Sequence, residues 1–260
     1  MSQSDAVNRG IPSPADLESG RLRYQAVQER IRAAAERAGR SLDDITLVGV
    51  AKRQPIERIL SAIAAGVRVL GQSYIQEARE IRPAIESALA LDPTLSRHPL
   101  EWRMVGLLQR NKAGLAARLF DAIETVDRPK LIETLARRAT EEGRPLDVLI
   151  QVSLCGESQK GGCESAMLST LAEQVLAAPG LNLRGLMTIP AASPDPEDAR
   201  PVFRALRELR PVLARLDTNL SVADLSMGMS GDLEVAVEEG ATLVRVGTAL
   251  FGTRVDSDTK

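Results

Sequence analysis

The stretch TLVGVAKRQP, residues 46–55, joins an apolar run directly to a lysine. An uninterrupted run such as residues 47–51 is typical of a strand that is buried on both faces. Two interpretations are open for Lys52, which follows the run. In the first, its ammonium group has reached solvent, since lysine is almost never fully buried unless it is paired. In the second, Lys52 is a desolvated amine nucleophile at the mouth of a barrel.

Similar apolar runs recur along the chain and alternate with helical patterns. The strand-like runs are residues 45–50, 67–70, 102–105, 120–126, 148–152, 183–187, 222–225 and 243–246. The helical patterns are residues 15–38, 56–65, 74–89, 111–119, 130–142, 165–177, 196–216 and 233–239. This alternation predicts parallel βα units, and eight of them in 260 residues favour a closed (β/α)8 TIM barrel over an open sheet. The pattern at 15–38 precedes the first strand and predicts an extra N-terminal helix.

Composition narrows the possible classes of protein. A net charge of −2 and an aromatic content of 2% give no basis for binding nucleic acid or an anionic membrane. We interpret the one histidine, His98, as a solvated loop residue, and the two cysteines, Cys155 and Cys163, as inert thiols, so no metal site is predicted. No signal peptide is evident. We therefore expect a cytoplasmic protein with a disordered tail over residues 1–14 and one domain over residues 15–256.

Two of the predicted strand ends are rich in small residues. DLSMGMSGDLE, residues 224–234, contains the end of the seventh strand, and RVGTALFG, residues 245–252, contains the end of the eighth. The loops at these places in a barrel often bind phosphate, because small residues let backbone N–H groups approach phosphate oxygens. The alternative is that the glycines only form turns. Two such stretches at neighbouring strands favour a phosphate site.

A phosphate site on one side of the barrel mouth and Lys52 on the other suit a ligand that has a phosphate and an aldehyde. Pyridoxal 5′-phosphate (PLP) has both groups and forms a Schiff base with lysine. Arg245 lies one alternation step before Gly247, and its inward side chain could face the pyridine nitrogen of such a ligand. A cation at that nitrogen opposes its protonation, so the ring becomes a weaker electron sink and carbanion chemistry is less favoured.

Several motifs carry a family resemblance as well. The chain resembles the YggS/PROSC family, the pyridoxal phosphate homeostasis proteins, which are similar to the barrel domain of alanine racemase without its second domain. The resemblance spans residues 21–254 and rests on the motifs GVAKRQP, GQSYIQE, WRMVGLLQRNK, RGLMTIP and LSMGMSGDLEVAVEEGATLVRVGTALFG. It implies a barrel of the alanine racemase N-terminal-domain type and an aldimine between PLP and Lys52. The cofactor-binding residues expected on this basis are Lys52, Ser73, Met187, Ser226, Met227, Gly228, Arg245, Gly247 and Thr248. Among them, Ser226 with its following backbone and Gly247 with Thr248 would hold the phosphate.

The chain also departs from the family pattern. Gln72 and Ser73 replace Glu and Asn of the family's GENYVQE, and Ser73 is shorter than the asparagine. Arg103 and Leu107 stand where the family's WHFIGHLQ has histidines. Lys160, in SQKGG, matches a family lysine near the barrel mouth, where it either assists PLP transfer or is a solvated loop charge; we favour the loop charge.

The function expected from these residues is that of a PLP carrier or buffer in vitamin B6 and amino-acid homeostasis. It would act as a monomer or weak dimer, and apo PLP-dependent enzymes would be its partners. No catalytic residue is predicted. The alternative is a weakly active PLP-dependent amino-acid racemase, which needs an acid or base on each face of the substrate. A third interpretation is a barrel enzyme for a phosphorylated substrate that does not use PLP.

Overall fold

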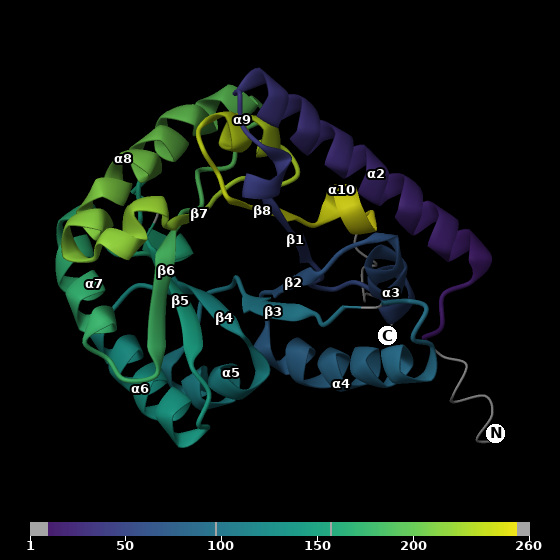
Figure 1. Cartoon of the computed structure of the whole chain (residues 1–260), viewed down its shortest axis with the longest axis horizontal. Coiled ribbons are helices and arrows are strands. Elements are labelled where there is room, and N and C mark those ends of the chain that lie inside the picture. Colours follow the sequence, from purple (N-terminus) through teal and green to yellow (C-terminus); the bar gives the residue numbers. More distant parts are fainter. Residues whose placement is uncertain (1–9, 97, 157, 254–260) are drawn as a thin grey trace.

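Eight parallel strands close into a barrel in sequential order, with β1 paired to both β2 and β8 (Figure 1). The computed structural model describes residues 10–96, 98–156 and 158–253. The strands are β1 (Thr46–Val50), β2 (Val69–Gln72), β3 (Glu101–Met104), β4 (Ala122–Val126), β5 (Leu146–Gln151), β6 (Leu181–Met187), β7 (Asp224–Ser226) and β8 (Leu243–Val246). The predicted (β/α)8 TIM barrel is confirmed.

Helices cover the outside of the barrel. They are α2 (Pro14–Arg37), α3 (Ile56–Ala65), α4 (Ile75–Leu91), α5 (Ala113–Leu119), α6 (Pro129–Glu141), α7 (Leu168–Leu176), α8 (Arg200–Leu216), α9 (Leu233–Glu238) and α10 (Thr248–Phe251). Each predicted helical pattern overlaps one of them. None of the helices in the described ranges is long and apolar enough to cross a membrane.

Two predicted strands are displaced toward the C-terminus, for local reasons. β2 begins at Val69 rather than at residue 67. The N–H of Val67 donates to the Ala62 carbonyl and so still belongs to the end of α3. β7 begins at Asp224 rather than at residue 222, because residues 218–222 form a 3-10 helix whose start is capped by the Asp217 side chain.

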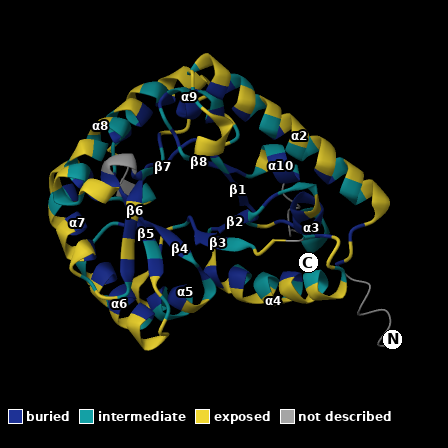
Figure 2. Ribbon diagram, in the orientation of Figure 1, coloured by how far each residue is buried: buried dark blue, intermediate teal, exposed yellow. Residues whose placement is uncertain are grey.

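The apolar core has two layers. The larger lies between the strands and the helices, and a smaller cluster fills the inside of the barrel. Figure 2 shows that the strands are mostly buried, whereas the surrounding helices also carry exposed residues. The inner cluster consists of Val48, Val50, Val69, Val105, Leu149, Met187 and Leu243. Polar side chains share the barrel interior with this cluster, and Glu124, Ser226 and Arg245 are all buried there. A charge inside a barrel is costly unless it is paired, so these residues point to a specific role.

The extra N-terminal helix is α2. Its first turn is closed by a capping box, in which Ser13 and Asp16 exchange hydrogen bonds between side chain and backbone. Gly20 lets α2 approach α3 closely, since a Cβ there would lie 2.7 Å from the Ser61 Cβ. The predicted disordered tail, 1–14, falls mostly on residues 1–9, which lie outside the described ranges, and stays a prediction.

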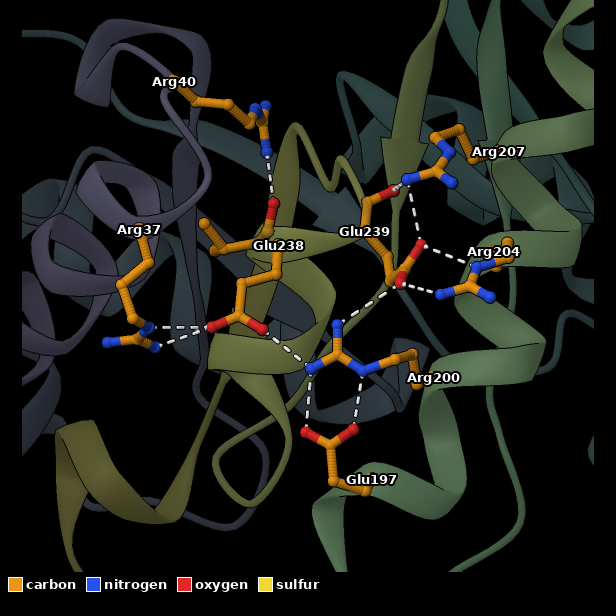
Figure 3. A network of polar contacts seen from close by, with 9 residues as sticks. Arg37, Arg40, Glu197, Arg200, Arg204, Arg207, Glu238 and Glu239 are labelled. Carbon is orange, nitrogen blue, oxygen red and sulfur yellow. Dashed lines mark hydrogen bonds and ion pairs between the residues drawn. The ribbon is translucent and has the colours of Figure 1, made fainter.

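A network of ion pairs joins α2, α8 and α9 (Figure 3). Its centre is the Glu239 carboxylate, which is only 5% exposed. Three arginine side chains from α8 contact it: Arg200 at 3.3 Å, Arg204 at 3.0 Å and Arg207 at 2.9 Å. Burial raises the pKa of Glu239, but the arginines outweigh burial and hold the pKa below its ordinary value. The neighbouring Glu238 pairs with Arg200 and, across to α2, with Arg37.

Replacing Glu239 by Gln should lower the free energy of unfolding by about 1–3 kcal/mol at pH 7, because three guanidinium groups lose their shared anion. The low pKa of Glu239 means that its contribution is present above the unfolded-state pKa and is lost as pH falls through the folded-state pKa. The difference between wild type and E239Q in urea unfolding should therefore shrink on acidification.

Glu197→Gln is the matched control, since Glu197 also pairs with Arg200 but its side chain is 58% exposed. That variant should change stability much less than E239Q does, because its ion pair is solvent-screened. Equal losses in the two variants, or a difference for E239Q that does not depend on pH, would contradict the role assigned to Glu239.

Candidate functional site

Lys52 lies just beyond the C-terminal end of β1, at the barrel mouth, and its side chain is partly buried. It lines a cavity of about 250 Å³ at the ends of β1 and β8. The described residues around this cavity are Val50, Lys52, Ser73, Val105, Ile189, Met229, Ser230, Gly231, Arg245, Gly247 and Thr248. The lysine is therefore neither fully solvated nor isolated in the core.

The backbone that follows Lys52 turns sharply. Arg53 has a φ of 55°, in the left-handed region that residues other than glycine seldom adopt. Its N–H donates to Glu77 Oε1 at 2.5 Å, and its guanidinium carbon lies 5.7 Å from the centre of the Tyr74 ring. Burial raises the pKa of the Glu77 carboxyl. These contacts hold the strained turn, and the turn fixes where the Lys52 side chain begins.

The two loops predicted to bind phosphate meet at the same cavity. Ser230 and Gly231 come from the loop after β7, and Gly247 and Thr248 from the end of β8. The Ala249 N–H donates to Ser230 Oγ at 3.3 Å and ties the loops together. The cavity therefore has hydroxyl groups and small residues in one part of its wall and the Lys52 side chain in another.

The loop after β7 is also held from outside the barrel. Arg30 of α2 donates to the Ser230 carbonyl at 2.9 Å and pairs with Glu234 at 2.6 Å. Gly228, with a φ of 90°, is required in this loop, because a Cβ there would overlap the Ala236 side chain. The extra N-terminal helix thus fixes the position of Ser230.

Arg245 forms the inner wall of the cavity and is buried. It donates from Nη1 to Ser226 Oγ at 2.7 Å and from Nη2 to the Thr188 carbonyl at 2.9 Å. Ser226 Oγ in turn donates to Glu124 Oε2 at 2.5 Å. Burial lowers the pKa of Arg245, and the nearby Glu124 opposes this. The guanidinium group is thus held by the barrel wall while it faces the cavity.

Of the nine residues expected to bind the cofactor, five line this cavity: Lys52, Ser73, Arg245, Gly247 and Thr248. The other four are placed differently. The Ser226 hydroxyl is occupied by Glu124 and Arg245, and the Gly228 carbonyl accepts from the Arg245 N–H. Met187 belongs to the inner core cluster and Met227 to the outer one.

Residues that sequence reasoning did not assign as ligands take their place in the cavity wall. Ser230 and Gly231 lie within the DLSMGMSGDLE stretch, so the stretch was identified, but the residue at which its chain reaches the cavity was not. Gly228 has a left-handed φ and forms a turn two residues before Ser230. A glycine at this position is the sequence signal that could have pointed to Ser230 as the residue that reaches the cavity. Ile189 and Met229 add apolar surface suited to a ring.

A second and wider chamber, of about 600 Å³, lies over the ends of β3, β4 and β5. It shares Lys52, Ser73, Val105 and Ile189 with the first cavity, so Lys52 stands where the two spaces join. The other described residues that line it are Tyr74, Ile75, Gln76, Met104, Gly106, Leu107, Gln109, Lys112, Thr125, Gln151, Gln159 and Lys160.

The positions that depart from the family pattern have separate surroundings. Leu107 is 52% exposed at the rim of the wider chamber, whereas Gln72 is buried at the end of β2. Arg103 is inside the barrel and pairs with Glu124. Lys160 lines the wider chamber, and its Nζ donates to the Pro190 carbonyl at 2.8 Å.

Other reactive groups give no separate site. Burial raises the pKa of the Cys163 thiol to about 11, with Asp127 adding to the effect, so this thiol stays protonated at neutral pH. Within the described ranges, His, Cys, Asp and Glu residues form no group of three or more that could hold a metal ion. The cavity itself fits a phosphate-bearing aldehyde with an aromatic ring: small residues and hydroxyls for the phosphate, a lysine for the aldehyde, and apolar side chains between.

A protein-family model and curated proteins of known name match most of this chain. The model of the alanine racemase N-terminal domain matches residues 22–255. The pyridoxal phosphate homeostasis protein of Vibrio cholerae is 42% identical over 239 residues, which cover 92% of this chain and 98% of that protein. The protein of the same name from Aquifex aeolicus is 43% identical over 232 residues, which cover 89% and 97%.

Solved structures also match most of this chain. PipY of Synechococcus elongatus, solved with PLP bound, is 35% identical with a TM-score of 0.71, and the match covers 87% of this chain and 100% of that one. A protein from Bifidobacterium adolescentis is 34% identical with a TM-score of 0.84, covering 94% and 100%. An alanine racemase from Clostridium difficile is 13% identical with a TM-score of 0.66, covering 91% and 58%, and shares the fold.

Gly106→Ala should lower the free energy of unfolding by about 1–3 kcal/mol, because the added methyl group would overlap the backbone of Ser73. Relief of that overlap must move Ser73, which lines both cavities. Urea unfolding measures the loss. Gly231→Ala is the control, since a Cβ at Gly231 would meet nothing within 4 Å, and its effect should stay within about 0.5 kcal/mol. Similar losses in both variants would show that the close approach of Gly106 to Ser73 does not matter.

Proposed function

The chain belongs to the family of pyridoxal phosphate homeostasis proteins, and we propose that it binds PLP as an aldimine of Lys52 and serves as a carrier or buffer of that cofactor. The observation that carries this proposal is the shared cavity. Lys52 lines it together with Ser230, Gly231, Gly247 and Thr248. An amine and a phosphate-binding wall in one cavity of about 250 Å³ are what a phosphorylated aldehyde requires.

In this arrangement the phosphate is held by the Ser230 and Thr248 hydroxyls and by backbone N–H groups at Gly231 and Gly247. Ser226 contributes through Arg245 rather than by direct contact, because its hydroxyl already bonds Arg245 and Glu124. Arg245 faces the ring nitrogen. Bound PLP supplies an electrophilic carbon and an electron sink, and a guanidinium group at the nitrogen weakens the second property.

The alternative function, racemisation, needs a second acid or base opposite Lys52. The sequence has two tyrosines. Tyr24 of α2 contacts Gly66, which precedes β2 and so lies at the end of the barrel opposite the mouth. Tyr74 lines the wider chamber but is 48% exposed, with the Arg53 guanidinium beside its ring. Neither tyrosine lines the smaller cavity that holds Lys52 and Arg245, and this supports a carrier over a racemase.

The wider chamber supports exchange of the cofactor. It reaches Lys52 from the side of β3 to β5, away from the phosphate loops. An amine from a recipient protein or a small molecule could approach the cofactor there while the phosphate stays bound. We propose apo PLP-dependent enzymes as partners, a monomer or weak dimer, and a cytoplasmic location, where the free thiols of Cys155 and Cys163 stay reduced.

Lys52→Ala should abolish the violet-region absorbance band that forms when PLP is added to the purified protein. Borohydride reduction of the wild type, followed by peptide mass mapping, should place the adduct on Lys52. The exposed Lys130 on α6 provides the matched control, and K130A should behave as wild type. A band that survives in K52A, or an adduct spread over surface lysines, would overturn the proposal.

The same sample separates carrier from racemase. The PLP-loaded protein is incubated with L-alanine in deuterium oxide, and Cα exchange and formation of D-alanine are followed. A carrier leaves the Cα hydrogen in place. Exchange that is lost in K52A would favour the racemase.

Thr248→Val should weaken PLP binding about tenfold, since one hydrogen bond to a charged phosphate is worth about 1.5 kcal/mol or more. Binding of pyridoxal, which lacks the phosphate, should not change. Thr134→Val, on the outer helix α6, controls for loss of a threonine hydroxyl elsewhere. Equal weakening for both ligands would mean that Thr248 acts on the ring or the aldehyde end, and the phosphate would have to be placed elsewhere.

A further inference from the structure

A line of buried polar side chains crosses the barrel interior beneath the cavity. Arg103 on β3 donates from Nη1 to Glu124 Oε1 on β4 at 3.1 Å. Glu124 Oε2 accepts from Ser226 Oγ on β7 at 2.5 Å, and Ser226 Oγ accepts from Arg245 Nη1 on β8 at 2.7 Å. Glu124 and Ser226 have no exposed surface, and Arg103 and Arg245 have 6% and 4%. Only Arg245 of the four lines the cofactor cavity.

We propose that Arg103 is a positioning residue for the cofactor: by neutralising Glu124 it keeps the guanidinium group of Arg245 directed at the cavity. Glu124 has two carboxylate oxygens, and each accepts a hydrogen bond from a different group. Arg103 takes Oε1, and the Ser226 hydroxyl takes Oε2. Arg245 therefore meets Glu124 only through the Ser226 hydroxyl and keeps its own charge for the cavity.

Without the Arg103 charge, the Glu124 carboxylate needs another cation as its partner. A buried carboxylate without a cation is costly, and Arg245 is the cation one hydroxyl group away. The expected response is a direct ion pair between Arg245 and Glu124. That pair would neutralise the guanidinium and draw it from the cavity.

The other charged groups near this line do not replace Arg103. Glu101 pairs with Arg103 at 2.7 Å, but its side chain is 39% exposed and its charge is screened by water. Asp224 also acts on Arg103, and its Oδ1 accepts from the Thr242 hydroxyl. Asp232 acts on Arg245 from the loop after β7, where it accepts from the Met229 N–H. All three groups are carboxylates, so none of them can replace Arg103 as the cation paired with Glu124.

The consequence for the cofactor rests on the proposed function. A charged guanidinium in front of the ring nitrogen keeps that nitrogen unprotonated, whereas a guanidinium paired to Glu124 opposes its protonation less. Arg103 lies outside the cavity, three strands from Arg245 around the barrel, and would then set the protonation of a cofactor that it does not touch.

The test compares Arg103→Met and Arg103→Lys with wild type. In R103M, the pH midpoint of the absorbance change of bound PLP should rise by about one unit, because the nitrogen loses an opposing charge. R103K keeps a cation beside Glu124 and should restore most of the wild-type midpoint. A residue that only stabilised the barrel would change thermal stability and leave the midpoint where it was.

R103M leaves a carboxylate without its cation and could fail to fold, so a second variant removes both charges. The double variant R103M/E124Q has no carboxylate to draw Arg245 from the cavity and keeps the wild-type net charge of this line, so its midpoint should return toward that of wild type. A midpoint in R103M equal to wild type would overturn the proposal, and so would an R103M/E124Q protein that shifts as far as R103M.

A measurement without PLP keeps the inference separate from the proposed function. The crystal structure of cofactor-free R103M should show Arg245 in direct hydrogen-bond contact with Glu124. An unmoved Arg245 would overturn the role of Arg103 even if PLP binds as proposed. If the wild type does not bind PLP but Arg245 moves in R103M, then the proposed function fails and the positioning role stands.

Discussion

A guanidinium group buried inside a closed barrel must have its charge and its donors satisfied by neighbouring strands. Arg245 on β8 sets this requirement, because burial and the closed sheet leave it almost no contact with water. Its two terminal nitrogens use Ser226 of β7 and the Thr188 carbonyl beyond β6. The Ser226 hydroxyl in turn donates a hydrogen bond to Glu124, and the Glu124 carboxylate is paired with Arg103. Four strands thus carry polar side chains inward to satisfy one cation, and the inner apolar cluster of Val, Leu and Met packs in the same interior.

The loop after β7 likewise depends on contacts from elements outside the barrel. The loop after β7 is long and glycine-rich, so its own backbone does not specify one conformation. Arg30 of α2 supplies the missing constraint by bonding the Ser230 carbonyl, and the Glu239 network fixes the α9 segment that follows the loop against α8. The helix that precedes the first strand is therefore part of the site, although none of its residues lines the cavity.

The sequence carried enough information for the barrel but only part of the site. Apolar runs and helical periods located all eight strands, because most strand residues are buried and the strands therefore need largely apolar segments. Lys52, Arg245, Gly247 and Thr248, which periodicity placed at strand ends, all line the cavity, and their role in binding a cofactor stays a prediction. Ser226 and Ser230 could not be told apart in this way. Both are small and hydroxylated, and the difference between them arises from a turn at Gly228 and from cross-barrel contacts that no local pattern encodes. The pairing of Arg103 with Glu124 was not foreseen for the same reason: it joins separate strands through a closed interior.

These features divide the site into two unlike halves. On the side that we propose for the phosphate, the loops after β7 and β8 are bonded to each other and to α2, so little conformational entropy remains to be lost when a ligand binds. On the lysine side, Lys52 borders a chamber more than twice as large as the cofactor cavity. A turnover enzyme gains from enclosing the reacting carbon, because exclusion of water strengthens every electrostatic contact there. A carrier gains from the opposite arrangement, in which affinity comes from the preorganised phosphate half while the covalent bond stays accessible to an incoming amine. The rigid half and the open half of this barrel mouth match the second requirement, and under the proposed function the cation at Arg245 would add to it by keeping the ring a weak electron sink.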